Sequence, residues 1–364
     1  MRNWLSGLGK AAAALALGAA LAACGQKPAE EAAAPARTEF TIGWTIYAGW
    51  MPWAYAEQAG IVDKWEQKYN IKINVVQIND YVESLNQYTA GRIDGVTSTT
   101  MDALTIPAAG GRDTTVVIAG DYSNGNDGII LKGATQLAQI RNRPVNLVEL
   151  SVSHYLLARA LETANISQTE VPTVNTSDAD IVAAFGAADT KAVVTWNPQL
   201  AEIAAMPGAH MVFDSSRIPA EILDTLVVST EALQSNPNLG KALAGIWYET
   251  MTLMSAQTPE GAAARAAMGQ LSGTDQAGYE AQLRTTAMYY TPAEALAFMR
   301  SAELVSATDR VRKFSFEHGL FGEGATSVDA IGITFPGGQS LGSADNVKLR
   351  FDDSYTAAAA AGEL

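Results

Sequence analysis

The sequence predicts an α/β protein of two lobes, each a mainly parallel sheet flanked by helices, with two crossings that join the lobes. Three observations support this fold class. From Glu39 onward, short segments rich in β-branched residues alternate with amphipathic helical segments, the pattern of βα units in a parallel sheet. The alternation restarts after a polar, glycine-containing segment at 121–128. A second polar segment at 215–219 can return the chain to the first lobe, so we expect a hinged cleft between the lobes.

The first lobe is expected to comprise residues 39–127 and 219–364. Its first part alternates strands at 40–44, 71–78, 95–97 and 114–119 with helices at 52–58, around Lys64-Trp65, at 82–89 and at 101–109. Pro52 suits the first turn of its helix, because proline lacks an amide hydrogen that would have no partner there. After the return we expect a strand at 223–229, mostly helical sequence to about residue 316, and a C-terminal strand at 347–351 with a helix after it.

The second lobe is expected to comprise residues 128–218. Its strands are predicted at 144–150, 171–174, 191–195 and 210–213, and its helices at 154–163, 179–187 and 198–205. Asp178 directly precedes the helix at 179–187, and an aspartate in that position usually accepts hydrogen bonds from the first free amides of the helix. We therefore expect Asp178 to act mainly as an N-cap.

The N-terminal segment is typical of an export signal. Two basic residues precede an apolar stretch at 11–23, which is too short for a membrane-spanning helix. The stretch leads into Leu21-Ala22-Ala23-Cys24-Gly25, a lipobox in which Cys24, the only cysteine of the chain, would carry the lipid. We therefore expect a signal peptide at 1–23, followed at 24–38 by the lipidated cysteine and a flexible tether.

The composition argues against several classes of function. The formal net charge is −14 at pH 7, which disfavours binding to nucleic acid or to an anionic membrane surface. The sequence has no His-Glu-x-x-His zinc motif, no Gly-x-Ser-x-Gly elbow and no Walker loop. Its three histidines are widely separated. We therefore expect no enzyme activity, no catalytic residues, no metal site and no cofactor.

Aromatic and acidic residues follow the predicted strands, where ligands of open parallel sheets bind. The turn after the first strand is aromatic, and most other corners carry a carboxylate. Aromatic faces beside carboxylates suit a planar cation, through cation–π contacts of about 0.5–2 kcal/mol and charge-assisted hydrogen bonds. The predicted ligand-binding residues are Trp44, Tyr47, Trp50, Asp80, Asp102, Asp121, Glu149 and Trp196.

Some of these acids have an alternative role. Asp80 and Asp102 stand close to the start of predicted helices and can cap them instead of contacting a ligand. Glu149 has no obvious capping role for the helix that follows it. We therefore expect Glu149 to be the foremost carboxylate contact.

Four features together resemble the nitrate, sulfonate and taurine class of periplasmic binding proteins, a class that shares its fold with thiamine-precursor binding proteins. They are the lipobox, the aromatic first turn, the two-lobe order and the turn Gly91-Arg92-Ile93-Asp94-Gly95. Longer strings are similar, more narrowly, to the urea or guanidine transporter binding proteins associated with urea carboxylase. These strings are Trp44–Trp53, Asn79–Ser84, Ser123–Gly128, Glu149–Tyr155 and Thr195–Pro198.

The resemblance implies the type II fold of periplasmic binding proteins and the role of a solute-binding lipoprotein of an ABC importer. Its partners would be a small-molecule ligand, the permease and ATPase subunits, and the membrane through the lipid on Cys24. The protein would lie at the periplasmic face of the cell membrane, and we expect a monomer. Ligand would stabilise a closed form of the two lobes, which the permease recognises.

The residues favour one of two ligands that are linked to this subfamily. Urea is neutral and needs both donors and acceptors, whereas guanidinium has only N–H donors and a fixed positive charge. Because the corners are acidic, we expect guanidinium first and urea second. Two other classes stay open: a binding protein for a sulfonate or nitrate-type anion, and a pyrimidine-precursor-related binder or enzyme on the same fold. The anion would need basic residues at the corners, and the enzymes carry a cysteine-rich motif that this chain lacks.

Overall fold

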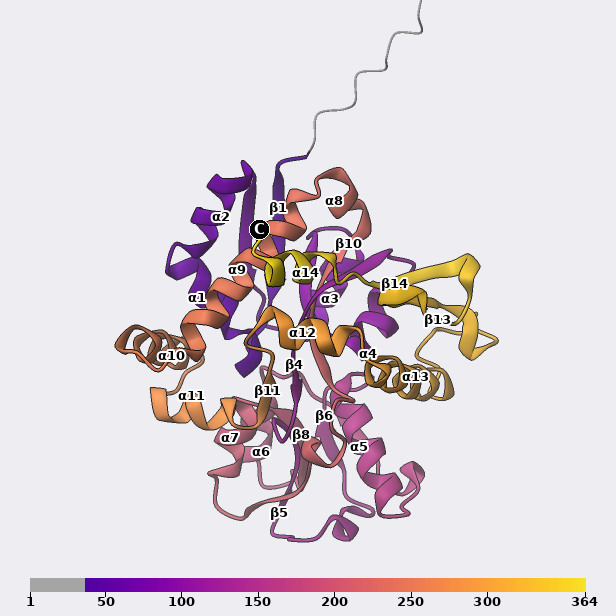
Figure 1. The fold of residues 1–364 in the computed structure, drawn as a ribbon. Coiled ribbons are helices and arrows are strands. Elements are labelled where there is room, and N and C mark those ends of the chain that lie inside the picture. Colours follow the sequence, from indigo (N-terminus) through magenta and orange to yellow (C-terminus); the bar gives the residue numbers. More distant parts are fainter. Residues whose placement is uncertain (1–36) are drawn as a thin grey trace, which may run out of the picture. The chain divides into compact units, whose positions relative to one another are not determined.

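The computed structural model describes residues 37–364 and confirms the predicted α/β fold of two lobes (Figure 1). One sheet has nine strands and the other has five. The predicted signal peptide, Cys24 and all but the end of the tether lie outside the described residues. Within residues 37–364, no helix combines the length and the apolar character that a membrane crossing requires.

The first lobe is built on the nine-stranded sheet, with the order β13-β12-β14-β4-β10-β3-β1-β2 and β11 paired to β4. Its strands are β1 (Glu39–Trp44), β2 (Lys72–Gln77), β3 (Gly95–Thr99), β4 (Thr114–Ser123), β10 (Leu223–Ser229), β11 (Thr286–Met288), β12 (Gly332–Thr334), β13 (Ser340–Leu341) and β14 (Val347–Phe351). The run Val116–Ile118 at the centre of the sheet is buried, which is why it is continuously apolar rather than alternating.

The direction of β10 decides what lies at the cleft edge of this sheet. β1 pairs in parallel with β2 and β3, as the βα alternation predicts, but β10 is antiparallel to both β3 and β4. The first residues of β10 therefore lie beside the last residues of its neighbours. Asp224 stands opposite Thr99 on one side and Asp121 on the other.

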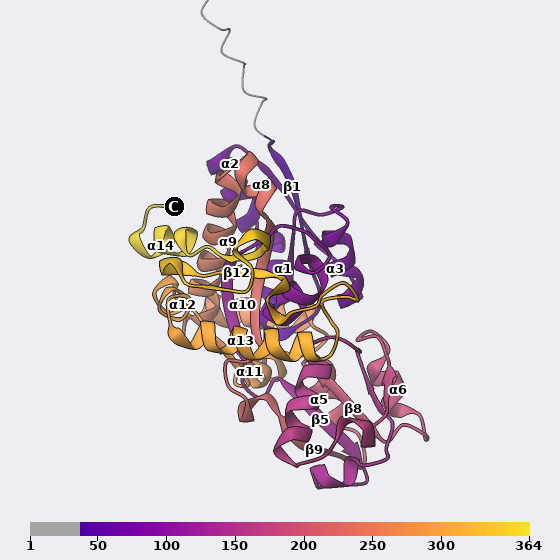
Figure 2. The same cartoon turned by 90° about the vertical axis from the view of Figure 1, so that its right-hand side faces the viewer.

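Helices cover both faces of the first sheet, and Figure 2 shows α3 on one side of the strands and α9 and α12 on the other. The helices are α1 (Met51–Gln58), α2 (Ile61–Tyr69), α3 (Tyr81–Thr89), α4 (Thr100–Ala103), α8 (Thr230–Ser235), α9 (Asn238–Ser255), α10 (Pro259–Leu271), α11 (Gln276–Leu283), α12 (Pro292–Met299), α13 (Ala302–Glu317) and α14 (Ser354–Ala361). The helix predicted at 101–109 is divided into α4 and a π-helical turn, Leu104–Ala108, because Pro107 has no amide hydrogen for a regular helical bond.

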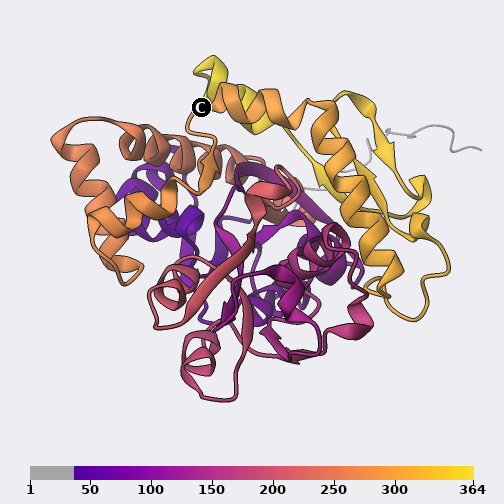
Figure 3. The ribbon, with the colours of Figure 1, turned by 90° about the horizontal axis from the view of Figure 1, so that it is seen from below.

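The second lobe is built on the five-stranded sheet, with the order β7-β6-β8-β5-β9. Its elements are β5 (Asp127–Lys132), β6 (Val145–Leu147), α5 (Val152–Thr163), β7 (Thr173–Asn175), α6 (Ile181–Gly186), β8 (Ala192–Trp196), α7 (Gln199–Ala204) and β9 (Ala209–Asp214). The strand predicted at 144–150 is shorter, because the chain leaves the sheet after Leu147 and turns at Leu150 with a φ of 62°. Figure 3 views this lobe from below, with C-terminal helices of the first lobe, in orange and yellow, on both sides of it.

The two crossings between the sheets are joined to each other by hydrogen bonds. The chain leaves the first sheet after Ser123 and returns between Asp214 and Leu223. The hydroxyl of Ser215 lies 2.7 Å from that of Ser123, and it accepts a hydrogen bond of 2.8 Å from the amide of Gly125. Both serines are fully buried, so the two crossings form one compact connection.

Candidate ligand-binding site

A small cavity of about 10 Å³ lies where the two lobes meet. The first lobe and its crossing contribute Tyr47, Trp50, Tyr81, Thr99, Ile222 and Asp224. The second lobe contributes Asp127, Val152 and Trp196. A cavity of this size holds about one water molecule, so even a ligand of a few heavy atoms requires the lining side chains to move apart.

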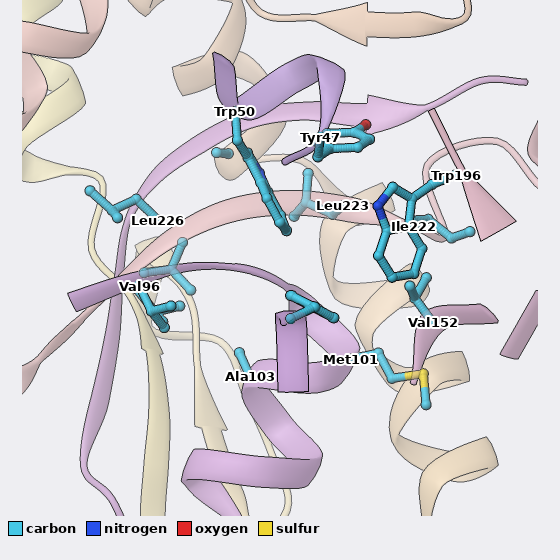
Figure 4. Packing of buried hydrophobic residues seen from close by; sticks show 14 of the residues in the cluster. Tyr47, Trp50, Val96, Met101, Ala103, Val152, Trp196, Ile222, Leu223 and Leu226 are labelled. Atoms are coloured by element: carbon cyan, nitrogen blue, oxygen red, sulfur yellow. The ribbon is translucent and has the colours of Figure 1, made fainter. Parts of the chain in front are cut away.

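Four aromatic side chains form one continuous wall of the cavity. The ring centroids of Tyr47 and Trp50 are 4.9 Å apart, those of Trp50 and Tyr81 5.7 Å, and those of Tyr81 and Trp196 5.6 Å. Figure 4 shows Trp50 beside Tyr47, and Trp196 with Val152 below it. The turn Ala48–Trp50 and the following α1, which has Pro52 in its first turn, place Tyr47 and Trp50 at this position.

Three carboxylates, which we call the acid cluster, surround one end of the cavity: Asp121, Asp127 and Asp224. Their exposed fractions are 0%, 3% and 3%. Burial raises the pKa of Asp127 to about 7. Burial also raises the pKa of Asp121 and that of Asp224, and repulsion within the cluster raises the pKa of Asp224 further. Water and counter-charge are thus both scarce around these carboxylates.

The acid cluster has free acceptor capacity. The Tyr47 hydroxyl donates a hydrogen bond of 2.9 Å to Asp121 Oδ1. Within the described part of the chain, Asp121 Oδ2 and Asp224 Oδ2 are buried and accept no hydrogen bond while both acids are ionised, whereas a proton on one acid would join the two carboxyl groups to each other. Buried polar atoms are rarely left unsatisfied, and such atoms beside a cavity indicate where donors of a ligand would bind.

The short turn before α1 can approach the acid cluster only because it contains glycine. A Cβ atom on Gly49 would lie 2.4 Å from Asp121 Oδ2 and 2.6 Å from the Tyr47 ring. Any larger residue would therefore displace the carboxylate or the ring. The close approach also leaves Trp50 next to Tyr47 in the cavity wall.

A fourth buried acid, Asp102, supports the wall from behind. It is fully buried, and its Oδ2 accepts hydrogen bonds of 2.8 Å from both the Tyr81 hydroxyl and the Thr99 hydroxyl. Burial raises its pKa to about 6, although these two hydrogen bonds favour the ionised form. Because Tyr81 and Thr99 line the cavity and Asp102 does not, Asp102 positions two lining residues.

Basic side chains are absent from this site as far as residues 37–364 show. None of the residues that line the cavity is lysine, arginine or histidine. Among the described side chains, no salt bridge involves Asp102 or any member of the acid cluster. The electrostatic potential of the cavity is therefore set by carboxylates.

The structure brings five of the eight predicted ligand-binding residues to the cavity or directly behind it. Tyr47, Trp50 and Trp196 line it. Asp121 is bonded to the lining residue Tyr47, and Asp102 is bonded to Tyr81 and Thr99.

The other three predicted residues lie elsewhere. Trp44 is buried in the hydrophobic core at the end of β1. Asp80 caps α3, accepting from the Glu83 amide at 2.8 Å, so its alternative role is the one that the structure shows. Glu149 lies in a separate hollow beside Leu150 and His318, because β6 ends two residues earlier and the turn at Leu150 carries it away from the cavity.

Sequence reasoning missed both Asp127 and Asp224 as site residues. They stand at the beginnings of β5 and β10, whereas site residues were expected only after the ends of strands. Both strands run antiparallel to their neighbours, so their first residues reach the same edge: Asp127 stands opposite Trp196, and Asp224 opposite Asp121. A signal was present, because Asp127 lies within the predicted crossing at 121–128 and Asp224 is the second residue of the strand predicted at 223–229.

Direct hydrogen bonds connect the two lobes beside the cavity. Ser177 of the second lobe donates to Asp80 Oδ2 at 2.8 Å, and Asp178 Oδ1 accepts from the Tyr81 amide at 3.2 Å. Asp178 therefore contacts the opposite lobe, and the expectation that it caps the next helix is wrong: α6 begins only at Ile181. These contacts indicate that the structure shows the lobes in a closed arrangement.

Comparisons with known proteins agree with this architecture. Residues 33–270 match the model of the NMT1-like family, and no curated protein matches the sequence. The alkanesulfonate-binding protein SsuA from Xanthomonas axonopodis pv. citri, bound to MOPS, is similar with a TM-score of 0.67 and 18% identity, over 80% of this chain and 96% of that one. The periplasmic aliphatic sulphonate-binding protein SsuA from Escherichia coli gives 0.63 and 18%, over 79% and 94%. The periplasmic nitrate-binding protein NrtA from Synechocystis PCC 6803 gives 0.60 and 12%, over 81% and 85%. The chain has the fold of these periplasmic binding proteins and belongs to the NMT1-like family.

Proposed function

We propose that the protein is the extracytoplasmic solute-binding component of an ABC importer, held at the membrane by a lipid on Cys24. Its cargo is a small, nitrogen-rich planar compound, with guanidinium favoured and urea second. The family and the two-lobed fold support the solute-binding role. The chemistry of the cavity supports the choice of cargo.

The observation that carries the choice of cargo is a buried acid cluster without a basic partner in the described chain. An ionised, unpaired carboxylate in a dry site costs several kcal/mol relative to water, unless a positive charge compensates it or a proton neutralises it. A bound cation supplies that charge. The free oxygens Asp121 Oδ2 and Asp224 Oδ2 then accept N–H groups from it.

The aromatic wall supports a flat, delocalised cation rather than a compact one. Trp50 and Trp196 line the cavity from opposite lobes (Figure 4). A planar cation between them would gain cation–π contacts while its edge points to the carboxylates. Guanidinium fits this arrangement of aromatic faces and edge carboxylates, because its N–H groups lie in the plane and its faces are apolar.

Urea has the same shape as guanidinium but lacks the charge. Its carbonyl oxygen would need a donor, and it would leave the carboxylates uncompensated. Protonation of part of the cluster would supply such donors, which is why urea stands second. The mechanism of capture is the same for both: the two lobes close over the ligand and the permease recognises the closed form.

The fold also supports an anion-binding alternative, since the named structural neighbours bind sulfonates or nitrate. An anion in this cavity would meet Asp127 and Asp224 directly, with no basic side chain of the described residues in the lining to offset them. The cationic cargo therefore accounts better for the residues present.

The test is calorimetric titration of the purified protein with four compounds: guanidinium chloride at concentrations far below denaturing ones, urea, MOPS and sodium nitrate. Potassium chloride at the same ionic strength is the control for salt effects. We expect saturable binding of guanidinium, weaker binding of urea, and none of either anion. Tight binding of MOPS or nitrate with none of guanidinium would contradict the cationic cargo.

A further inference from the structure

We infer that the acid cluster makes closure of the lobes dependent on charge: over an empty cavity its buried carboxylates oppose closure at neutral pH, and a bound cation removes that opposition. The inference rests on the proposed function, because it takes the lobes to close over a cationic ligand. It adds that the positive charge of the ligand, beyond its shape, decides whether the closed form is populated.

Side chains of both lobes cover the acid cluster. Asp224 and Asp121 belong to the first sheet, whereas Trp196 and Val152, which line the same cavity, belong to the second lobe. Movement of the second lobe away from the first would remove these two apolar side chains from the acid cluster. Asp127 and Asp224, which line the cavity and are 3% exposed here, would then regain water. Closure without a ligand is therefore a desolvation of negative charge.

The titratable groups that face the acid cluster from the surrounding elements are acidic or neutral. Asp102 on α4 adds negative charge and raises the pKa of Asp127. The other titratable neighbours of the cluster are phenols, and burial raises the pKa of each above its usual value, so they carry no charge near neutral pH. They are Tyr47, Tyr279, Tyr289 and Tyr290. Within the described chain, no lysine or arginine stands among the groups that shift these acids.

Protons can neutralise the acid cluster in place of a cationic ligand. Closure over an empty cavity favours the neutral acids, so the closed form binds protons more readily than the open form. Acid conditions should therefore permit closure without ligand, and neutral conditions should prevent it. An isosteric amide in place of one acid should act in the same way at every pH.

The experiment measures lobe closure directly, by small-angle X-ray scattering of the ligand-free protein at pH 8 and pH 5. We expect a larger radius of gyration at pH 8 than at pH 5. Asp127→Asn should reduce the radius of gyration at pH 8 and flatten its pH dependence, and Asp224→Asn should do the same. Asp189→Asn is the matched control, because it removes an exposed carboxylate of the second lobe outside the cavity and should behave as the wild type.

Two variants keep the test informative if one fails to fold, as circular dichroism would show. The inference is overturned if the ligand-free wild type is as compact at pH 8 as at pH 5, or if neither amide variant differs from Asp189→Asn. Because no ligand is present, the result is separate from the cargo. Guanidinium binding with equally closed lobes in its absence would refute the charge dependence alone, and charge-dependent closure without guanidinium binding would refute the cargo alone.

Discussion

At the scale of single residues, the site depends on atoms that the fold leaves without partners. Asp224 is the clearest case: it lines the cavity, it is 3% exposed, and its Oδ2 has no hydrogen-bond partner among the described residues while both it and Asp121 are ionised. Its neighbours in the sheet, Thr99 and Asp121, hold it at the cleft edge from both sides. We therefore expect Asp224 to contribute little to the stability of the fold and much to the recognition of a positively charged ligand.

Asp224→Asn should weaken guanidinium binding by roughly 10- to 150-fold, since hydrogen bonds to charged groups contribute about 1.5–3 kcal/mol. Urea binding should fall less, because the neutral ligand does not use the lost charge. Calorimetric titration of both ligands checks this. Glu149→Gln is the control, as Glu149 lies in a separate hollow and its replacement should leave affinity unchanged. Equal losses for both ligands would show that Asp224 acts through shape rather than charge.

At the scale of elements, the turn Ala48–Trp50 couples backbone geometry to the site. The Tyr279 hydroxyl donates to the carbonyl oxygen of Ala48 at 2.9 Å, which fixes the turn against α11. Gly49 lies so near Asp121 that no side chain fits between them. The position of the acid cluster thus depends on the path of the turn as well as on the sheet.

Gly49→Ala should lower guanidinium affinity at least several-fold while the protein stays folded, because the new methyl group overlaps Asp121 Oδ2 at 2.4 Å. Intrinsic tryptophan fluorescence during titration, together with circular dichroism, separates binding from folding. Gly186→Ala adds the same methyl group at the end of α6, where no atom lies within 4 Å, and should change neither. Unchanged affinity in Gly49→Ala would mean that the turn can shift at no cost to the site.

The elements also show how far the sequence could predict this molecule. The parallel strands, the helices between them and the aromatic turn follow from local pattern, and Tyr47, Trp50 and Trp196 were predicted as site residues from it. Asp127 and Asp224 were missed, because the direction of β5 and β10 is set by the crossings and is not visible in their own residues. Glu149 was misplaced because the left-handed turn at Leu150 shortens the strand before it.

At the scale of the whole molecule, the proposed ligand and protons would compete for the same carboxylates. A cation would bind the ionised cluster, whereas the closed, empty form holds protons, with a pKa of about 7 for Asp127. The pKa of an exposed aspartate is about 3.9. Between these two values, protons should displace the cation and affinity should fall as the pH is lowered.

Guanidinium affinity should therefore be constant near pH 8 and should fall progressively from about pH 7 to pH 5. Binding in that window should release protons. Titration at each pH in two buffers of different ionisation enthalpy measures both quantities. Urea provides the control, because a neutral ligand gains no advantage from ionised carboxylates. Guanidinium affinity that is flat from pH 8 to pH 5 would contradict the role given to the acid cluster.

The paired serines at the crossings have a consequence for how the lobes can move. Ser123 and Ser215 are hydrogen-bonded to each other, so the two connecting segments cannot bend independently. Because the two connecting segments are joined, we expect the lobes to rotate about one shared axis rather than twist against each other. Under the proposed function, opening and closing of the lobes would then be one shared motion in which both connecting segments take part.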